Sequence, residues 1–456
     1  MTLSIANGAG FLGDNLNAPR LLVEAAEVDY LTLEYLAELT MSILAAIRAK
    51  NANGGFAGDF LEVLSTLSPA ILQQPQLKII TNAGGVNPNS CAKAAASILI
   101  AAGLADERIG VVTGDDILTR LDELQSAGCR FESLETGEPL ADVSEQIVTA
   151  NAYLGAKPIC DALMSDARFV ITGRVADASL TVGPAMTEFD WQWDDWTKLA
   201  AATVAGHLIE CGAQVTGGYS TQWNQYDLSD VGYPIAELSE EGGCVITKPA
   251  SSGGAITRQT VVEQLVYEIG DPAHYLTPDV DVDFTTVEVQ ASNDDRVNVF
   301  GAIGGPAPDS YKVSLAYRSG FTAIGQLLVY GNDCIEKARE CGTIVFERLK
   351  RAGVELATTN TELLGAGDRF SDNKANTNEV VLRLTVQDPR REAVERFTKE
   401  IAPLITSGPA GLAGYAAGRN RVIPAFTYWP CLVPKELIEA NVEVRTAREW
   451  ATFHDK

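Results

Sequence analysis

The sequence predicts an α/β fold: an N-terminal, mostly parallel sheet flanked by helices, followed by a layered α+β second domain. Two observations predict it. In the first half of the chain, short apolar runs alternate with helical stretches, which is typical of a parallel sheet with crossover helices. Further on, polar and apolar residues alternate as they do in antiparallel strands. A chain of 456 residues also exceeds one ordinary core, so we expect two domains, at residues 1–270 and 271–456.

Five short apolar segments are the predicted strands of the first domain, and the lengths between them suit right-handed crossovers. These strands are expected at Leu3–Asn7, Asp29–Glu34, Leu77–Thr81, Ile109–Thr113 and Arg168–Thr172. Helices are expected at Pro19–Ala26, Leu36–Ala49, Asp59–Leu67, Cys91–Ala102 and Ile117–Ala127. The segment Leu36–Ala49 has apolar residues at helical spacing, and Pro19 suits the first turn of a helix.

The later segments are assigned by the same patterns. A buried helix is expected at Ala200–Cys211, a strand at Cys244–Thr247 and a helix at Thr257–Ile269. In the second domain, strands are expected at Val280–Gln290, Lys312–Arg318, Ala323–Tyr330 and Asn378–Gln387, and helices at Asp333–Ala352 and Arg390–Ile405. The segments Ala425–Pro434 and Ala440–Arg445 are candidate closing strands.

Composition and charge exclude several classes of protein. The formal net charge of −25 gives an acidic surface, which repels nucleic acids and anionic lipids. No run of about 20 apolar residues could span a membrane, and the N-terminus has no secretion-signal pattern. The eight cysteines contain no C-x-x-C pair, so we expect reduced, buried thiols. Three histidines are too few for a His-rich metal site. We expect a cytoplasmic protein with no nucleic-acid or membrane partner.

A glycine-rich loop follows the first predicted strand. Residues 8–13 have the G-x-G-x-x-G spacing, and Glu34 follows about 20 residues later, as in dinucleotide-binding units. A dinucleotide site, however, needs a helix that begins at the glycines, whereas this helix is expected to begin near Pro19. The carboxylate of Asp14 would also repel a pyrophosphate. We therefore expect a loop that lets the backbone approach a substrate at Gly10, and we consider NAD unlikely as a cofactor.

Polar residues follow each predicted strand of the first domain. Because the carboxyl ends of parallel strands line one crevice, we expect these residues to meet there. The candidates are Asp14 after the first strand, Glu34 after the second, Asn82, Gly84 and Gly85 after the third, Asp115 after the fourth, and Arg174 and Asp177 after the fifth.

Clustered carboxylates favour acid–base catalysis, because neighbouring negative charges raise the pKa of one of them. Asp177 or Asp14 is the expected acid–base group, and Glu34 is a further catalytic candidate. The same carboxylates would suit a divalent cation such as Mg²⁺, so the sequence leaves the cofactor open.

The remaining candidates are predicted to bind the substrate. Arg174 would hold a substrate carboxylate or thioester oxygen. Asn82, with the backbone amides of Gly84 and Gly85, would stabilise an enolate. Asp115 is placed in the same crevice.

Each of these residues also has a structural interpretation. Arg174 could pair with Asp177, and the acidic residues could cap the helices that follow them. His207, three residues before Glu210, is a catalytic candidate as one half of an acid–base pair, or the two residues could bind a metal. A buried histidine is more often a hydrogen-bonded core residue.

Several segments resemble the acyclic terpene utilisation protein A family, in the same order along nearly the whole chain. They include Gly8-Ala9-Gly10-Phe11-Leu12-Gly13-Asp14, Ile80-Thr81-Asn82-Ala83-Gly84-Gly85-Val86-Asn87-Pro88, Ile171-Thr172-Gly173-Arg174-Val175-Ala176-Asp177 and Gly206-His207-Leu208-Ile209-Glu210-Cys211-Gly212. Longer members of that family carry a small ferredoxin-like domain after the matched region. The resemblance therefore implies that a separate ferredoxin-like subunit supplies this domain, or that this branch lacks it.

The resemblance implies bacterial catabolism that runs through acyl-CoA thioesters. The leading hypothesis is an enzyme of carboxylic-acid or acyl-CoA metabolism with lyase or hydratase chemistry, acting on a small-molecule carboxylate or thioester. The alternatives are a non-catalytic subunit or scaffold of a catabolic complex and an NAD(P)-dependent oxidoreductase. Large acidic metabolic enzymes are often symmetric, so a homo-oligomer is expected.

Overall fold

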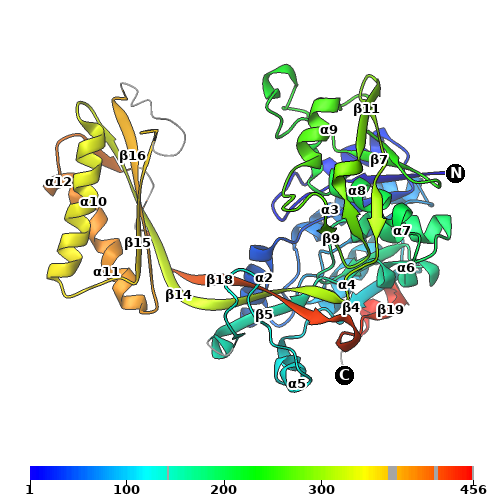
Figure 1. The fold of residues 1–456 in the computed structure, drawn as a ribbon, viewed down its shortest axis with the longest axis horizontal. Coiled ribbons are helices and arrows are strands. Elements are labelled where there is room, and N and C mark those ends of the chain that lie inside the picture. Colours follow the sequence, from blue (N-terminus) through cyan, green and yellow to red (C-terminus); the bar gives the residue numbers. More distant parts are fainter. Residues whose placement is uncertain (141–142, 368–376, 415–417, 419, 454–456) are drawn as a thin grey trace. The chain divides into compact units, whose positions relative to one another are not determined.

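The chain divides into two units in the computed structural model, which describes residues 1–456 apart from 141–142, 368–376, 415–417, 419 and 454–456. Unit 1 contains residues 1–142, 148–315 and 428–456, and unit 2 contains residues 143–147 and 316–427 (Figure 1). This division differs from the boundary predicted near residue 270. The reason is that residues 288–300 form two strands of the sheet in unit 1.

Unit 1 is built on a sheet of ten strands among the described residues, in the order β11-β12-β8-β7-β1-β2-β3-β6-β4-β19. The central run of β1, β2, β3, β6 and β4 is parallel, as predicted, and antiparallel strands flank it on both sides. The bounds are β1 (Thr2–Asn7), β2 (Tyr30–Leu33), β3 (Lys78–Thr81), β4 (Arg108–Thr113), β6 (Phe169–Thr172), β7 (Ile235–Ser239), β8 (Cys244–Thr247), β11 (Glu288–Asn293), β12 (Arg296–Phe300) and β19 (Asn441–Thr446).

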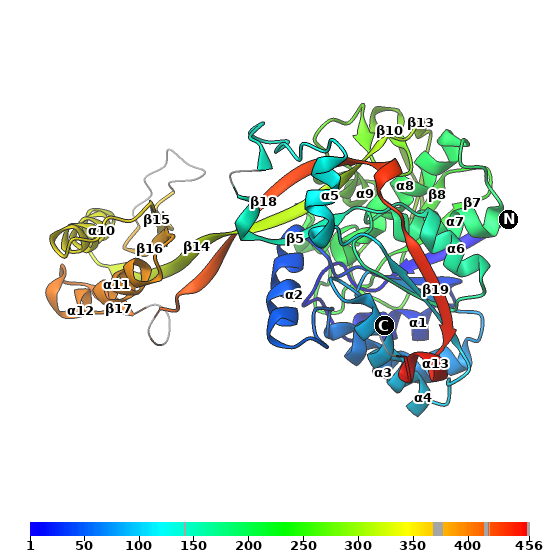
Figure 2. The same ribbon diagram turned by 90° about the horizontal axis from the view of Figure 1, so that it is seen from below.

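Helices cover both faces of the parallel strands, which are buried on both sides as their apolar sequences require. Four helices share a hydrophobic core with β1, β2, β3, β4 and β6: α1 (Ala18–Ala25), α3 (Asp59–Gln73), α4 (Pro88–Ala101) and α13 (Ala447–Ala451). Helix α13 packs on α4 (Figure 2). A second group packs on the same sheet through other residues: α6 (Lys157–Met164), α7 (Ser179–Phe189) and α8 (Trp196–Glu210).

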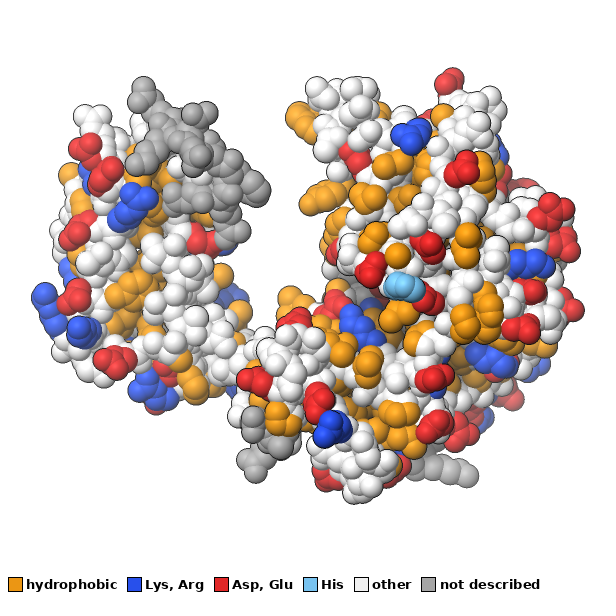
Figure 3. Space-filling view, viewed as in Figure 1, with side chains coloured by type: hydrophobic (Ala, Val, Ile, Leu, Met, Phe, Trp, Pro, Cys, Tyr) orange, Lys and Arg blue, Asp and Glu red, His pale blue; other side chains and the backbone are white. Residues whose placement is uncertain are grey.

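Unit 1 contains further helices and a second, smaller sheet. The helices are α2 (Glu38–Lys50), α5 (Leu121–Ser126) and α9 (Arg258–Leu265), and the strand β5 (Ile147–Ala152) pairs with β14 (Ser310–Tyr330). A three-stranded sheet is formed by β9 (Tyr275–Leu276), β10 (Asp281–Asp283) and β13 (Ile303–Gly305). Acidic side chains are scattered over the surface seen in Figure 3, in keeping with the net charge of −25.

Unit 2 is an antiparallel sheet with helices on one face, in the β-α-β-β-α-β order of ferredoxin-like folds. The strand order is β15-β16-β14-β17. Leu382, Leu384 and Val386 of β16 pack with Val345 and Phe397 of the helices. The bounds are α10 (Cys334–Arg351), β15 (Thr358–Leu364), β16 (Glu379–Asp388), α11 (Arg391–Ile401), α12 (Leu404–Ser407) and β17 (Leu412–Gly414). The layered α+β prediction is confirmed; the separate ferredoxin-like subunit stays a prediction.

Two predicted segments differ from the observed elements. The strand predicted at Val280–Gln290 is interrupted by a 3₁₀ turn at Phe284–Thr286, where the side chain of Asp283 accepts a hydrogen bond from the Thr285 amide. The strands predicted at Lys312–Arg318 and Ala323–Tyr330 form one continuous strand, β14. A second long strand, β18 (Ile423–Pro434), pairs with it.

Candidate functional site

The candidate site is a cavity of about 460 Å³ in unit 1, at the carboxyl ends of β1, β2 and β6. Six carboxylates and one guanidinium line it, together with aromatic side chains. The charged residues are Asp14, Glu34, Glu38, Asp177, Glu210, Glu268 and Arg174, and the aromatic ones are Phe11, Tyr219, Tyr233 and Tyr267. The prediction that strand-end residues converge is confirmed for four of the candidates, namely Asp14, Glu34, Arg174 and Asp177.

Arg174 is the central cation of this cavity and is only 2% exposed. Its guanidinium lies 4.1 Å from the centroid of the Tyr153 ring, close enough for a cation–π interaction. Nη1 donates to the carbonyl oxygen of Leu36 at 2.7 Å and lies 3.0 Å from Asp177 Oδ1 and 3.9 Å from Glu34 Oε1. Arg174 therefore pairs with Asp177, as the structural interpretation proposed, and it also links the ends of β2 and β6.

Glu34 is a buried acid whose two oxygens differ. Oε1 accepts hydrogen bonds from the Leu36 amide at 2.8 Å and from Asn82 Nδ2, whereas Oε2 is buried and has no hydrogen-bond partner among the described residues. Asn82 in turn accepts a bond from the Tyr35 amide at 2.8 Å. Because Oε1 is occupied by two donors, a proton on this carboxyl group belongs on Oε2.

The environment raises the pKa of both acids beside Arg174. Burial, followed by the charge of Asp177, raises the pKa of Glu34 to about 8, against the lowering effect of Arg174 and Asn82. Burial also raises the pKa of Asp177 to about 7, with Arg174 opposing and Glu210 and Glu38 adding to the rise. About a third of the Asp177 side chain is exposed to solvent, but its Oδ1 is buried and receives no hydrogen bond among the described residues.

Two strand-end residues hold the backbone of residues that line the cavity. Asp115 is 3% exposed, and its Oδ2 accepts bonds from the Arg174 amide at 2.9 Å and from Asn151 Nδ2 at 2.8 Å. Burial raises its pKa to about 6. Asn7, at the end of β1, donates to the carbonyl oxygens of Ile209 and Glu210 at 2.6 and 2.8 Å. Asp115, predicted to bind substrate, is thus placed to position the backbone of Arg174.

His207 lies behind the cavity wall and is 1% exposed. Its Nδ1 is 3.1 Å from Glu210 Oε1, and its Nε2 is 3.0 Å from the carbonyl oxygen of Gln264. Burial opposes protonation of the ring, but the hydrogen bond and charge of Glu210 outweigh it and raise the pKa of His207. Since both ring nitrogens are occupied, the direct catalytic role predicted for His207 does not fit; Glu210 is the member that lines the cavity.

The glycine predictions are only partly supported. The helix after the first loop begins at Ala18, as expected, and Gly10 lines the cavity. A side chain at Gly10 would collide with the backbone of Cys211 at 2.7 Å, and its amide donates to Asp14 Oδ2 at 2.8 Å. The side chain of Asp14 therefore binds the backbone of its own loop.

Gly84 and Gly85, whose amides are predicted to stabilise an enolate, do not line this cavity. The Gly85 amide donates to the Asn82 carbonyl oxygen at 3.1 Å, so it is already occupied. Side chains at Gly84 and Gly85 would meet the Thr172 carbonyl oxygen and the Leu44 side chain, each at 2.4 Å. These glycines permit close packing of the turn after β3.

Sequence reasoning missed several lining residues. Glu38 accepts a 2.9 Å hydrogen bond from the Tyr153 hydroxyl. Glu268 and the tyrosines at positions 219, 233 and 267 come later in the sequence than all of the parallel strands. Tyr233 donates a hydrogen bond to Asp14. Only Glu210 carried a signal, through its spacing from His207.

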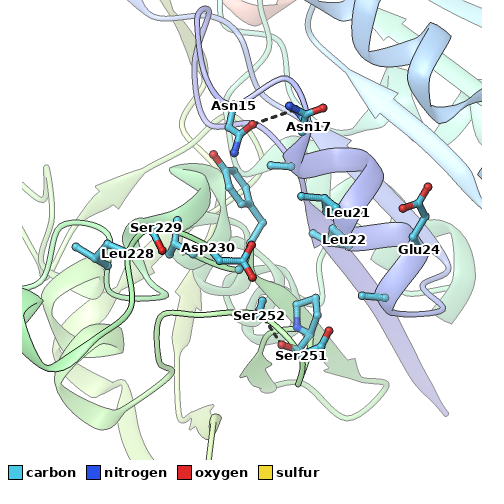
Figure 4. A pocket seen from close by; sticks show the side chains of 16 residues that line it. Asn15, Asn17, Leu21, Leu22, Glu24, Leu228, Ser229, Asp230, Ser251 and Ser252 are labelled. Atoms are coloured by element: carbon cyan, nitrogen blue, oxygen red, sulfur yellow. Dashed lines mark hydrogen bonds between the residues drawn. The ribbon is translucent and has the colours of Figure 1, made fainter.

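A second cavity, of about 560 Å³, lies beside α1 (Figure 4). Its lining combines apolar side chains such as Leu21, Leu22 and Leu228 with polar ones such as Asn15 and Ser252. The two acidic residues of this lining, Glu24 and Asp230, are exposed, whereas the first cavity contains the buried acid Glu34, so the first cavity is the candidate active site. Tyr233 lines both cavities.

Three further findings concern metals, membranes and thiols. Within the described ranges, no group of three or more His, Cys, Asp or Glu side chains is arranged to hold a metal ion. None of the helices in the same ranges combines the length and apolar character needed to cross a bilayer. All eight cysteines are free thiols; seven are buried, and the partly exposed one, Cys211, lines the candidate site.

Comparison with known proteins gives a family for the chain. The model of the family described as "Acyclic terpene utilisation family protein AtuA" matches residues 3–444. A search of curated proteins and a search of solved structures each gave no match. The match spans nearly the whole chain and includes every residue of the candidate site. The chain therefore belongs to the acyclic terpene utilisation family AtuA.

Proposed function

We propose that this protein is a catabolic enzyme with lyase or hydratase chemistry on a carboxylic acid or acyl-CoA thioester. The proposal rests on one observation. Glu34 Oε2 and Arg174 Nε are buried and have no hydrogen-bond partner among the described residues, and both residues line the cavity together with Asp177, whose Oδ1 forms an ion pair with Arg174. Buried polar atoms are nearly always paired in folded proteins, so Glu34 Oε2 and Arg174 Nε are suited to bind the polar group of a substrate.

The surroundings of the two acids divide their roles. Glu34 is buried, which raises its pKa and favours the neutral acid, and its proton on Oε2 can be donated to a developing enolate oxygen. Asp177, whose side chain is about a third exposed and is paired with Arg174, is the member that can accept a proton from the carbon next to the substrate carbonyl. The charge of Arg174 stabilises negative charge at both positions.

The charge of the cavity favours the acyl part of a thioester. Six carboxylates line the cavity, and they would repel the phosphate groups of coenzyme A. A neutral thioester carbonyl can approach the protonated Glu34 without this penalty. In this proposal the acyl group enters the cavity and the nucleotide part of the substrate stays outside.

The test is a substrate panel of 2-unsaturated acyl-CoA thioesters and hydroxy acids, with gain or loss of water followed by mass spectrometry. Asp177→Asn is expected to lower turnover by about 100-fold or more, because it removes a general base. Asp230→Asn, in the second cavity, is the matched control and should leave turnover unchanged. Full turnover by Asp177→Asn would refute the role of Asp177. An inactive wild-type chain with a stoichiometric protein partner would favour a non-catalytic subunit.

A further inference from the structure

The proposed chemistry requires a second proton-transfer group. In the hydratase direction, the oxygen of water bonds to the β-carbon and keeps one proton as the new hydroxyl group. The second proton of the water is released, and the α-carbon takes up a proton as the carbon–carbon double bond is lost. Protonated Asp177 can supply the proton of the α-carbon, but a different group must accept the proton that the water releases. Glu210 lines the same cavity and is close enough to Asp177 for its charge to raise the pKa of Asp177.

The position of Glu210 is fixed by contacts on both its backbone and its side chain. Asn7 holds the carbonyl oxygens of Ile209 and Glu210, which end α8. The side chain is 13% exposed and its Oε1 contacts His207 Nδ1 at 3.1 Å. The carboxylate is thus held at the wall of the cavity by one buried ring.

His207 is itself locked by α9. The carbonyl oxygen of Gln264 can only accept a hydrogen bond, so His207 Nε2 must carry a hydrogen in every protonation state. Gln264 Nε2 returns a bond to the His207 carbonyl oxygen at 3.2 Å. Consequently the contact between His207 Nδ1 and Glu210 Oε1 contains one proton. This proton lies either on Nδ1, which makes His207 an imidazolium, or on Glu210.

The neighbouring titratable groups around the imidazole ring do not compete with His207 and Glu210 for this proton. The rings of Tyr275 and Phe284 lie 5.9 and 5.4 Å from the imidazole. Burial raises the pKa of Tyr275 well above its usual value and likewise raises that of Cys211, the next residue after Glu210, so both stay neutral. Asp177 and Glu268, whose charges act on Tyr275 together with that of Glu210, also line the cavity.

We propose that Glu210 is the second catalytic carboxylate of the cavity and that His207 is the positioning residue that holds it and stores its proton. The catalytic role of Glu210 rests on the proposed function, whereas the pairing of Glu210 with His207, called the dyad below, does not. Glu210 would accept a proton from the attacking water in hydration, or return it to the departing hydroxyl group in dehydration. Asp177 and Glu34 would act on the α-carbon and the carbonyl oxygen.

The dyad is tested without turnover by ¹⁵N NMR of the imidazole rings in the full chain. The chain has three histidines, and His207→Gln and His274→Gln assign the signals. We expect the apparent pKa of His207 to lie above its ordinary value in the wild type and to fall in Glu210→Gln, because an opposite charge is removed. The exposed pair of His274 and Asp281 is the internal control. An unchanged His207 titration in Glu210→Gln would overturn the dyad.

The catalytic half is tested by separating two reactions of one substrate. Glu210→Gln should lower hydration by about 100-fold while exchange of the α-proton with solvent stays within about threefold of the wild type, since that step uses Asp177. Equal loss of both reactions, or loss of neither, would overturn the role of Glu210. A wild-type chain that shows neither reaction would refute the proposed function and this role with it, whereas the NMR titration would still decide the dyad.

Discussion

At the scale of single residues, Arg174 makes the acidic cavity possible. It is buried, stacks on Tyr153 and faces both Glu34 and Asp177. Replacing one member of a buried charged cluster leaves its partners uncompensated, which costs about 3 kcal/mol or more. We expect Arg174→Met to lower the free energy of unfolding by that amount, measured by urea denaturation at pH 7.

A matched variant separates the effect of losing a buried charge from the effect of losing a surface charge. Arg20 pairs with Glu24 on the surface of α1, where an ion pair contributes at most about 1 kcal/mol. Arg20→Met should therefore lower stability by less than that. Equal losses in the two variants would show that Arg174 is not a buried counter-ion.

Glu34 should make stability depend on pH. Its pKa is about 8 in the folded chain, against an ordinary value of 4.5. Between these values the folded state binds more protons than the unfolded state, so the free energy of unfolding falls as pH rises through this window. Glu34→Gln mimics the protonated acid. It should match the wild type near pH 4.5 and become more stable than the wild type towards pH 8, by up to about 1.4 kcal/mol per pH unit.

Urea denaturation at pH 5, 6.5 and 8 measures this difference between the two proteins. A difference that stays constant across the three pH values would contradict a raised pKa at Glu34. A variant that becomes less stable than the wild type at pH 8 would show that Glu34 is stabilising when ionised.

At the scale of elements, the end of α8 depends on the end of β1. Asn7 is 1% exposed and donates to the carbonyl oxygens of Ile209 and Glu210 at the end of α8, where a helix lacks its regular backbone donors. We expect Asn7→Ala to lower the free energy of unfolding by about 2 kcal/mol, because buried carbonyl groups lose their donors. Thermal and urea denaturation measure this loss. Asn224→Ala, at an exposed position, is the control; an equal, small effect in both would refute the role of Asn7.

The strand-end cluster could be predicted because it depends on topology alone. Five parallel strands bring their carboxyl ends to one edge, so Glu34, Asn82 and Arg174 had to lie near one another. What each atom does could not be predicted in this way. The Gly85 amide is occupied by a carbonyl oxygen of its own turn, and local sequence does not show which donors are already paired. Glu38 is another case, because its partner Tyr153 is 115 residues away.

The domain boundary is another feature that the local sequence pattern does not reveal. The alternating pattern after residue 280 predicts antiparallel strands, which the structure contains apart from the 3₁₀ turn at Phe284–Thr286, but the pattern does not state which sheet a strand joins. Strands β11 and β12 pair with β8 at the edge of the first sheet, and the ferredoxin-like arrangement begins only within β14.

At the scale of the whole molecule, the two units have separate hydrophobic cores. Leu384 is 1% exposed in the core of unit 2, and Ile171 is 1% exposed in the core of unit 1. A leucine or isoleucine to alanine change in a core costs about 2–5 kcal/mol. We expect Leu384→Ala to increase amide hydrogen exchange across residues 316–427 and leave that of residues 77–82 unchanged, as followed by mass spectrometry.

Ile171→Ala is the reciprocal variant. It should increase exchange across the parallel strands of unit 1 and spare the helices of unit 2. Increased exchange throughout the chain in both variants would indicate a single cooperative unit and contradict two separate cores.

The central claim is that the cavity removes a proton from the carbon next to a carbonyl group, with Asp177 as base and Glu34 as the neutral acid. The most direct test is incorporation of deuterium at that carbon when saturated acyl-CoA thioesters and carboxylic acids are incubated with the full chain in D₂O, followed by mass spectrometry. We predict incorporation by the wild type and by Asp230→Asn, and a loss of about 100-fold or more in Asp177→Asn and Glu34→Gln. Incorporation that is absent from the wild type, or that survives in both cavity variants, would contradict the account.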